Sequence, residues 1–167
     1  MRRIGVAALV IALASLGLAQ DARKSGFEFM QPATQALQKD DTQNPAMLWV
    51  KDGQALWAQR DGTANKSCAD CHGDINRMRD VATRYPKYSG DAKRVISLSQ
   101  QINQCRTTRQ HAKPWAAEDA TLLGLEAAIA IESRGLPVAP PLQPQLADAQ
   151  KRGETLFNQR KIGRAHV

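Results

Sequence analysis

The sequence predicts an all-α fold, and three observations lead to it. Helical spacing of apolar side chains recurs along the chain. Only 5% of the 167 residues are aromatic, which argues against an aromatic-rich β-sandwich and leaves little material for an apolar core. A Cys-x-x-Cys-His motif at residues 68–72 indicates a bulky prosthetic group that fills this gap. The length accommodates one ordinary domain, or a small domain and part of a second.

The N-terminus has the features of an export signal. Arg2 and Arg3 form a short positive segment, and residues 4–18 form an uncharged apolar run. Small residues at its end predict cleavage after Ala19, so residues 1–19 form a signal peptide. The run is shorter than the roughly twenty residues that a membrane-spanning helix needs, so we expect no membrane anchor after signal removal. We expect the mature protein in the periplasm, where its basic charge gives little reason to expect a nucleic-acid partner.

Cys68, Cys71 and His72 form the attachment motif of haem c. Two thiols one helical turn apart reach the two vinyl groups at one porphyrin edge, and the following histidine can bind the iron from one side. A zinc site would need a second pair of ligands, which the sequence does not offer. A redox dithiol of the thioredoxin type normally follows a strand, and no strand pattern precedes residue 68. We therefore predict one covalent haem c with His72 as an axial iron ligand.

One helix is predicted before the motif and one after it. Residues 47–59 follow an Asn-Pro start signal, and in this segment Gly53 lies one turn from Trp57. Residues 118–134 show the clearest helical pattern, and a glycine and a proline follow it. The apolar face of that segment consists of Leu122, Leu125 and Ile129. Two helices that cross closely at a glycine beside a haem are typical of a class I cytochrome c-like domain, which is the architecture we predict.

The second axial ligand is not the methionine that is usual in small electron-carrier cytochromes. Met78 lies too close to His72 in the sequence to reach the opposite face, and the other three methionines precede the motif. Two candidates remain downstream, Cys105 and His111. Cys105 is the one cysteine that remains when the other two form thioethers. A thiolate is a suitable ligand for haem iron, and it lowers the reduction potential of the haem. We favour Cys105 and keep His111 as the alternative.

The remaining chain contains an internal repeat. Residues 135–145 form a proline-rich linker after the predicted first domain, residues 20–134. Beyond the linker, a Gly-x-x-Leu-aromatic pattern that begins at Gly153 repeats the pattern that begins at Gly53. The repeat after a linker predicts that a second domain of the same kind begins here.

This second domain is expected to be truncated. The spacing from the first Gly-x-x-Leu-aromatic pattern to its haem motif, counted from the second pattern, reaches one residue past Val167. We interpret residues 146–167 as the start of a second cytochrome c domain that contains only its first helix. From about Ile162 the sequence matches the translation of a sequencing adapter, so we expect a foreign tail there.

Five segments have a more specific pattern than the haem motif alone. They are Ser25–Met30, Asp41–Trp49, Lys66–Gly73, Ile102–Arg106 and Ser133–Pro137. Taken together they resemble SoxA, the cytochrome subunit of the SoxAX complex of bacterial thiosulfate oxidation. The likeness extends from Ser25 to about Gln159. In dihaem members of that family the first haem is attached as at Cys68 and Cys71. The resemblance implies that His72 and Cys105 are its axial ligands.

The resemblance also implies an enzyme, the L-cysteine S-thiosulfotransferase, with SoxX as the partner subunit of SoxA. This enzyme couples thiosulfate oxidatively to a cysteine of the SoxYZ carrier protein, and electrons leave through c-type haems to a c-type cytochrome acceptor. Monohaem members lack the first haem and keep a disulfide there, so the complete motif here implies the dihaem type. The family's active-site haem and catalytic cysteine belong to the second domain, so we expect one haem and no catalytic residue in this chain. The alternative is a simple periplasmic electron-transfer c-type cytochrome.

Overall fold

The computed structural model describes residues 24–160, which divide into two compact units. The first unit ends at residue 39 and contains the 3-10 helix η1 (Gly26–Phe29) and helix α1 (Pro32–Lys39). The side-chain amide of Gln35 donates hydrogen bonds to two backbone carbonyls of the preceding segment, at 3.0 and 3.1 Å. These bonds join η1 and α1 into one small substructure.

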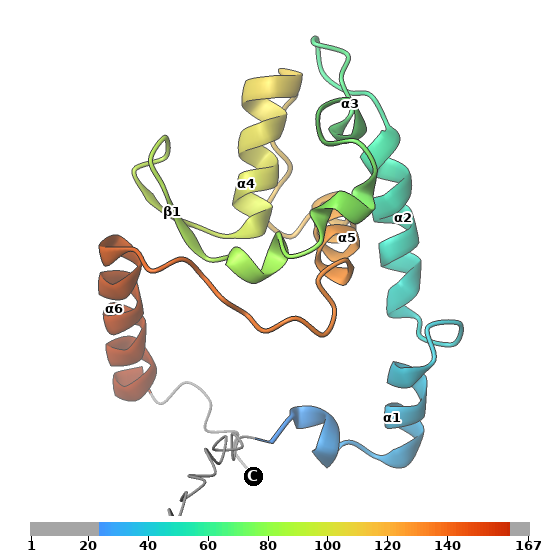
Figure 1. Ribbon diagram of the computed structural model, residues 1–167, viewed down its shortest axis with the longest axis vertical. Helices are drawn as coiled ribbons and strands as arrows, with labels where there is room; N and C mark the ends of the chain where they lie inside the picture. Colours follow the sequence, from blue (N-terminus) through green and yellow to red (C-terminus); the bar gives the residue numbers. More distant parts are fainter. Residues whose placement is uncertain (1–23, 161–167) are drawn as a thin grey trace, which may run out of the picture. The chain divides into compact units, whose positions relative to one another are not determined.

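The second unit begins at residue 40 and contains the Cys-x-x-Cys-His motif. Its elements are α2 (Ala46–Ala58), α3 (Cys68–His72), the 3-10 helices η2 (Ile75–Met78) and η3 (Ala82–Arg84), β1 (Lys87–Ser89), β2 (Arg94–Ile96), α4 (Leu98–Cys105), the π-helix η4 (Arg106–Gln110), α5 (Ala120–Ile131) and α6 (Pro144–Arg160). Within the described residues the only sheet is the antiparallel β1–β2 pair. The predicted all-α class is therefore confirmed. Figure 1 shows α3 beside one end of α2, and α4 running from the β1–β2 hairpin toward the same end.

Helices α2 and α5 pack closely at Gly53, as predicted, and the structure places a second glycine, Gly124, at the same contact. A methyl group on Gly53 of α2 would overlap the backbone carbonyl of Gly124 in α5 and lie 2.8 Å from the Cβ of Ala128. Because neither glycine has a side chain, the two backbones approach closely. The apolar residues of α2 do not all lie on its buried face. Val50 and Trp57 are buried, whereas Leu48 is 65% exposed.

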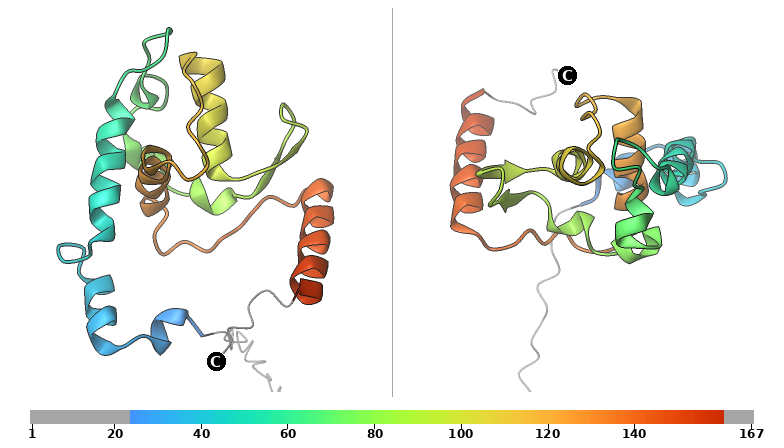
Figure 2. Two further views of the ribbon diagram at one scale, coloured as in Figure 1. Left: turned by 180° about the vertical axis from the view of Figure 1, so that it is seen from behind. Right: turned by 90° about the horizontal axis from the view of Figure 1, so that it is seen from above.

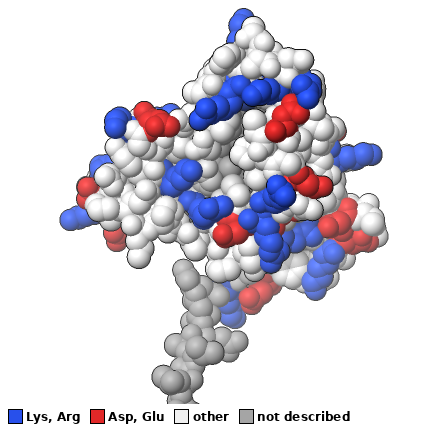
Figure 3. Space-filling model, turned by 45° about the horizontal axis from the view of Figure 1, so that its top comes forward, with Lys and Arg blue, Asp and Glu red and all other residues white. Residues whose placement is uncertain are grey.

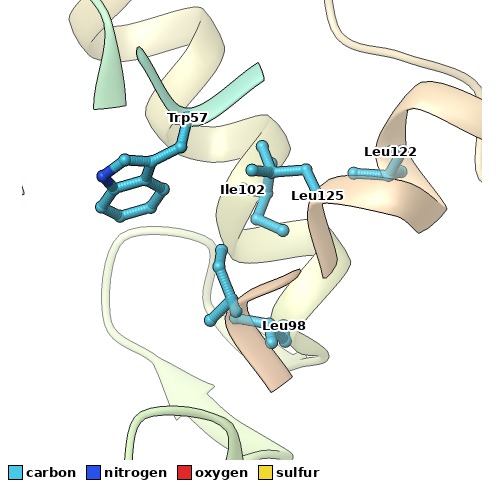
Figure 4. Packing of buried hydrophobic residues seen from close by; sticks show 6 residues of the cluster. Trp57, Leu98, Ile102, Leu122 and Leu125 are labelled. Carbon is cyan, nitrogen blue, oxygen red and sulfur yellow. The ribbon is translucent and has the colours of Figure 1, made fainter. Parts of the chain in front are cut away.

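The core of the second unit comes from three helices. It consists of Trp57, Leu98, Ile102, Leu122, Leu125 and Ile129 (Figure 4). The three predicted apolar residues of α5 are all in it, and Leu122 and Leu125 are only 1% exposed. Burial of each such side chain contributes about 1.5–3 kcal/mol to folding. Helix α4 adds two side chains one turn apart and was not singled out from the sequence, because it is short and mostly polar.

The predicted linker, residues 135–145, is hydrogen-bonded to the rest of the second unit at two points. The backbone N–H of Ala139 donates to the carbonyl of Thr83 at 2.9 Å, and the N–H of Tyr88 donates to Oε1 of Gln143 at 2.8 Å. At the start of α6, Leu146 is only 4% exposed. Figure 2 shows α6 beside the β1–β2 hairpin, with which it is in contact. The proline-rich segment therefore follows a defined path.

Two predictions fall outside the described residues. They are the signal peptide over residues 1–19 and the foreign tail from about Ile162. Among residues 24–160, none of the helices combines the length and the apolar character needed to cross a bilayer.

Candidate functional site

A cavity of about 500 Å³ lies in the second unit, and the haem motif forms part of its wall. Five of the six core residues line it, so its floor is apolar. The lining residues with a thiol or imidazole group are Cys68, Cys71, His72 and Cys105. The structure therefore brings the three motif residues and the favoured distal candidate to one cavity.

The start of helix α3 is fixed by reciprocal hydrogen bonds. The hydroxyl of Ser67 accepts from the backbone N–H of Asp70 at 3.0 Å, and Oδ2 of Asp70 accepts from the N–H of Ser67 at 2.8 Å. Arg60 donates to Oδ1 of Asp70 at 2.9 Å. The backbone hydrogen bond from Ser67 is the main cause that lowers the pKa of the Asp70 carboxyl, so the carboxylate stays charged at the helix N-terminus. Asp70, which lies between Cys68 and Cys71 in the sequence, thus stabilises the N-terminus of the motif helix.

The end of helix α3 is held by Trp57 of α2. Its indole Nε1 donates to the carbonyl of Gly73 at 2.8 Å, and its ring centroid lies 5.8 Å from that of His72. Gly73 has a φ of +74°, which favours glycine, and its N–H donates back to the carbonyl of Ala69 at 2.8 Å. The backbone on either side of His72 is therefore held by hydrogen bonds to α2 and within α3.

The two motif thiols lie in different environments. Cys71 is exposed, whereas Cys68 is half-buried. Burial is the main cause that raises the pKa of the Cys68 thiol, and the neighbouring Cys105 raises it further. This electrostatic effect of Cys105 on Cys68 agrees with their shared position on the cavity wall.

Helix α4 presents one face to the cavity. Its lining residues, Leu98, Gln101, Ile102 and Cys105, follow the i, i+3, i+4, i+7 spacing of a single helical face. The amide of Gln101 lies 3.6 Å from the sulfur of Cys105. The other candidate, His111, is exposed, ends the π-helix with a φ of +55° and does not line the cavity. Of the two distal candidates, Cys105 lines the cavity beside the motif residues and His111 does not.

The segment after α4 is tied to the segment before the motif. Arg106 forms an ion pair with Asp61 at 2.8 Å, and the side-chain amide of Gln110 donates to the carbonyl of Lys66 at 2.8 Å. The hydrogen bond from Arg106 is the main cause that lowers the pKa of Asp61. These bonds join the segment that precedes Cys68 to the segment that follows Cys105. From the sequence, Arg106 stood out only as part of a longer segment, and no local pattern pointed to Asp61 as its partner.

The cavity has a basic rim. The lining residues with a positive side chain are Lys66, Arg77, Arg84, Lys87, Arg106 and Arg109. No Asp or Glu of residues 24–160 lines it. Figure 3 shows Lys and Arg side chains gathered around a hollow on the face in view. The rim therefore favours a ligand with negative groups at its edge.

These features fit a haem. The volume lies in the usual range of cofactor sites, and the apolar floor suits a porphyrin. Haem also has two propionates, which match a basic rim. The donor set of two adjacent thiols, an imidazole and a third thiol is one that haem c can use fully.

A family model decides the class of the domain. The model described as "SoxA/TsdA, cytochrome c domain" matches residues 52–138, just over half of the chain. The chain belongs to this SoxA/TsdA cytochrome c domain family. Since the family is one of cytochrome c domains, its cofactor is haem c.

Individual relatives are similar over most of the chain. The L-cysteine S-thiosulfotransferase subunit SoxA of Rhodovulum sulfidophilum is 36% identical over 82% of this chain and 48% of its own length. The subunit of the same name from Pseudaminobacter salicylatoxidans is 36% identical over 80% and 47%. A thiosulfate dehydrogenase of Thiomonas intermedia is 27% identical over 83% and 49%.

A solved structure of the family matches the fold. The crystal structure of SoxXA from P. pantotrophus gives a TM-score of 0.74 at 26% identity, over 80% of this chain and 50% of that one. The chain thus spans about half the length of the relatives it matches. The predicted SoxA-like cytochrome c fold is confirmed.

Proposed function

We propose that this chain is the N-terminal part of a SoxA-type subunit of L-cysteine S-thiosulfotransferase and holds a haem with an electron-transfer role. The observation that carries the proposal is the convergence of Cys68, Cys71, His72 and Cys105 on one cavity. The 36% identity to two SoxA subunits supports the same conclusion. No catalytic residue is assigned to this chain, because the active-site cysteine belongs to a second domain in this proposal.

Four residues would attach and ligate the haem. The thiols of Cys68 and Cys71 would each add across one vinyl group, and this forms a thioether without any net oxidation. His72 and the Cys105 thiolate would bind the iron from opposite sides. When bound, the haem accepts and donates one electron, and a thiolate ligand keeps its reduction potential low. Trp57 supports this assignment because it holds the backbone beside His72.

Basic side chains of the rim would bind the propionates. The motif would hold the vinyl side of the haem, and the negative propionates would need positive partners elsewhere on the cavity wall. Arg84 and Lys87 line the cavity, and Lys87 pairs with Ile96 in the hairpin, two residues before Leu98, which begins α4, whereas Cys105 ends it. Helix α4 rises about 10 Å between those two residues, since each residue adds about 1.5 Å. Arg84 and Lys87 are therefore the residues we assign to the propionates.

We further propose the predicted domain order. Residues 20–134 would form the first cytochrome c domain, residues 135–145 the linker, and residues 146–167 the start of a second domain. Helix α6 supports this order because it contains the repeated Gly-x-x-Leu-aromatic pattern. Its Leu156 and Phe157 are 49% and 57% exposed, as expected for side chains that would pack against other helices of the proposed second domain. The full-length protein would then hold two haems.

The proposed partners follow from the relatives. The matched crystal structure is that of a SoxXA complex, so we propose a SoxX-type cytochrome as the partner subunit. The name of the relatives, L-cysteine S-thiosulfotransferase, supports transfer of a thiosulfate group to a cysteine. We propose thiosulfate and a SoxYZ-type carrier as the substrates and a c-type cytochrome as the electron acceptor. The site of action would be the periplasm.

An assay with the complete gene product tests this function. The holoprotein is mixed with a SoxX-type subunit, a SoxYZ-type carrier, thiosulfate and oxidised cytochrome c. We expect a heterodimer on gel filtration, carrier mass increased by a thiosulfate adduct, and reduced cytochrome. Formation of tetrathionate without a carrier would favour a thiosulfate dehydrogenase instead, in line with the Thiomonas relative. Cytochrome reduction without either sulfur product would favour the simple electron-transfer cytochrome.

A further inference from the structure

We propose that Arg106 is a positioning residue for the haem: it fixes the Cys105 thiolate and supplies a buried positive charge that raises the reduction potential. This inference rests on the proposed ligation by Cys105. It concerns a residue that touches neither the vinyl groups nor the iron in the proposed assignment. Four contacts hold the guanidinium of Arg106 in place.

Arg106 is buried although it is charged. Its side chain is only 7% exposed, and arginine is rarely buried unless it is paired. One nitrogen donates to Oδ2 of Asp61 at 2.8 Å, and two nitrogens donate to the carbonyl of Lys113 at 3.0 and 3.2 Å. The guanidinium also stacks on the ring of Trp115, 3.4 Å from its centroid. This combination of a fork of donors and a planar stacking group is specific to arginine.

These contacts join three segments of the chain. Asp61 precedes the haem motif, Arg106 directly follows Cys105, and Lys113 and Trp115 lie in the returning loop. The loop is itself held, because the amide of Asn103 and the backbone of Trp115 exchange hydrogen bonds at 2.9 Å in both directions. Arg106 therefore sets the position of the end of α4 relative to the motif.

The backbone at this point is unusual. Cys105 ends an α-helix and Arg106 begins a π-helix, whose wider turn occurs frequently at functional sites. The buried guanidinium anchors the first residue of that turn. A thiol at the end of a helix that lacked this anchor would be free to shift along the cavity wall.

The charge of Arg106 also acts on the cavity. Arg106 lines the cavity, so its guanidinium lies beside any ligand that is bound there. Its partner Asp61 has a side chain that is 48% exposed, so water screens the carboxylate more than the guanidinium. The pair therefore leaves a net positive field at the haem. Such a field favours the ferrous form, which has one positive charge fewer.

Redox titration and electron paramagnetic resonance of the holoprotein test this role. In Arg106→Gln we expect the ratio of ferric to ferrous haem, at a fixed applied potential, to rise at least tenfold. For a one-electron couple, a tenfold rise corresponds to a fall of about 59 mV in the reduction potential of the haem. We also expect a second low-spin ferric species beside the thiolate species. Arg106→Lys keeps the positive charge but lacks the planar guanidinium with its several N–H donors. Its reduction potential should therefore stay close to that of the wild type, and its ferric spectrum should still contain two low-spin species.

Arg109→Gln is the matched control. Arg109 lies on the same π-helix and lines the same cavity, but it is exposed, so its charge is screened by water. We expect a potential shift less than a third of that in Arg106→Gln and a single thiolate species. If Arg106→Gln shifts the potential no more than this control and keeps one species, the proposal is wrong.

A second variant guards against misfolding. If Arg106→Gln does not fold, Asp61→Asn leaves the guanidinium without its counter-charge and should raise the potential. An unchanged or lower potential in Asp61→Asn would overturn the proposal. A wild-type spectrum without a thiolate signature would overturn the Cys105 ligation as well. Wild-type thiolate ligation together with unaffected Arg106 variants would overturn the role of Arg106 alone.

Discussion

Replacement of Gly53 by alanine tests the closest approach of α2 and α5. The added methyl group would overlap the carbonyl of Gly124 and lie 2.8 Å from the Cβ of Ala128. Both neighbours belong to the backbone or sit directly on it, so no side chain can rotate away. The two helices must therefore separate, and the wall that holds Trp57 moves with α2.

The magnitude follows from two opposing effects. Alanine is a better helix former than glycine by about 1 kcal/mol. Overpacking in a core costs about 1–3 kcal/mol, and more where the backbone must shift. Because the overlap here is with backbone, we take a cost of about 4 kcal/mol, which leaves a net loss of about 3 kcal/mol. For a unit of this size the loss corresponds to a fall in Tm of roughly 10 °C.

Thermal and urea unfolding, followed by far-UV circular dichroism, measure this loss. Two matched variants calibrate it. At Gly90 nothing lies within 4 Å of an added methyl group, so Gly90→Ala should leave the free energy of unfolding within about 0.5 kcal/mol of the wild type. At Gly124 the nearest atom is the carbonyl oxygen of Trp49 at 3.3 Å, so Gly124→Ala should fall between the two.

The order of stability of the three variants tests whether the backbones of α2 and α5 are in close contact. If Gly53→Ala is as stable as Gly90→Ala, the two backbones are not in the close contact described here. The same holds if Gly124→Ala is the most destabilised of the three.

Three further predictions concern two residues of the cavity wall and the ion pair between Asp61 and Arg106. Trp57→Phe keeps an aromatic ring but leaves the carbonyl of Gly73 without its indole donor, so urea unfolding should show a loss of about 1–2 kcal/mol. Ser67→Ala removes the cap of the motif helix and should cost about 1 kcal/mol, whereas Ser67→Thr, which can still cap, should cost less than half of that. The ion pair with Arg106 lowers the pKa of Asp61, so its stabilising effect is complete above the unfolded pKa of about 3.9 and is lost as the pH falls through the lower folded pKa. Unfolding titrations from pH 5 to pH 2 should therefore show a shallower acid loss in Asp61→Asn, and an unchanged slope would contradict this.

Much of the fold could be predicted from residue spacing. The α2–α5 pair was predicted because apolar spacing and a glycine one turn from a large ring are local signals. The apolar face Leu122, Leu125 and Ile129 is buried as expected. Helix α4 was not predicted, because it has few apolar residues and is stabilised by packing against α5, although its capping box, Ser97-x-x-Gln100, is present in the sequence.

The site was predicted only in part for a similar reason. The motif residues and Cys105 stood out by residue type and spacing. The supports of the site join residues far apart in the sequence, such as Trp57 to Gly73 and Arg106 to Asp61, and no local pattern records such pairs. The capping pair Ser67 and Asp70 was an exception, since its Ser-x-x-Asp pattern lies in the sequence and was overlooked.

Electron paramagnetic resonance of the ferric holoprotein tests the central claim most directly. The claim is that the haem attached at Cys68 and Cys71 lies between His72 and Cys105. We expect a low-spin thiolate spectrum in the wild type and in His111→Ala, and its loss in Cys105→Ala. A spectrum that survives in Cys105→Ala but changes in His111→Ala would contradict the account and would assign the distal position to histidine.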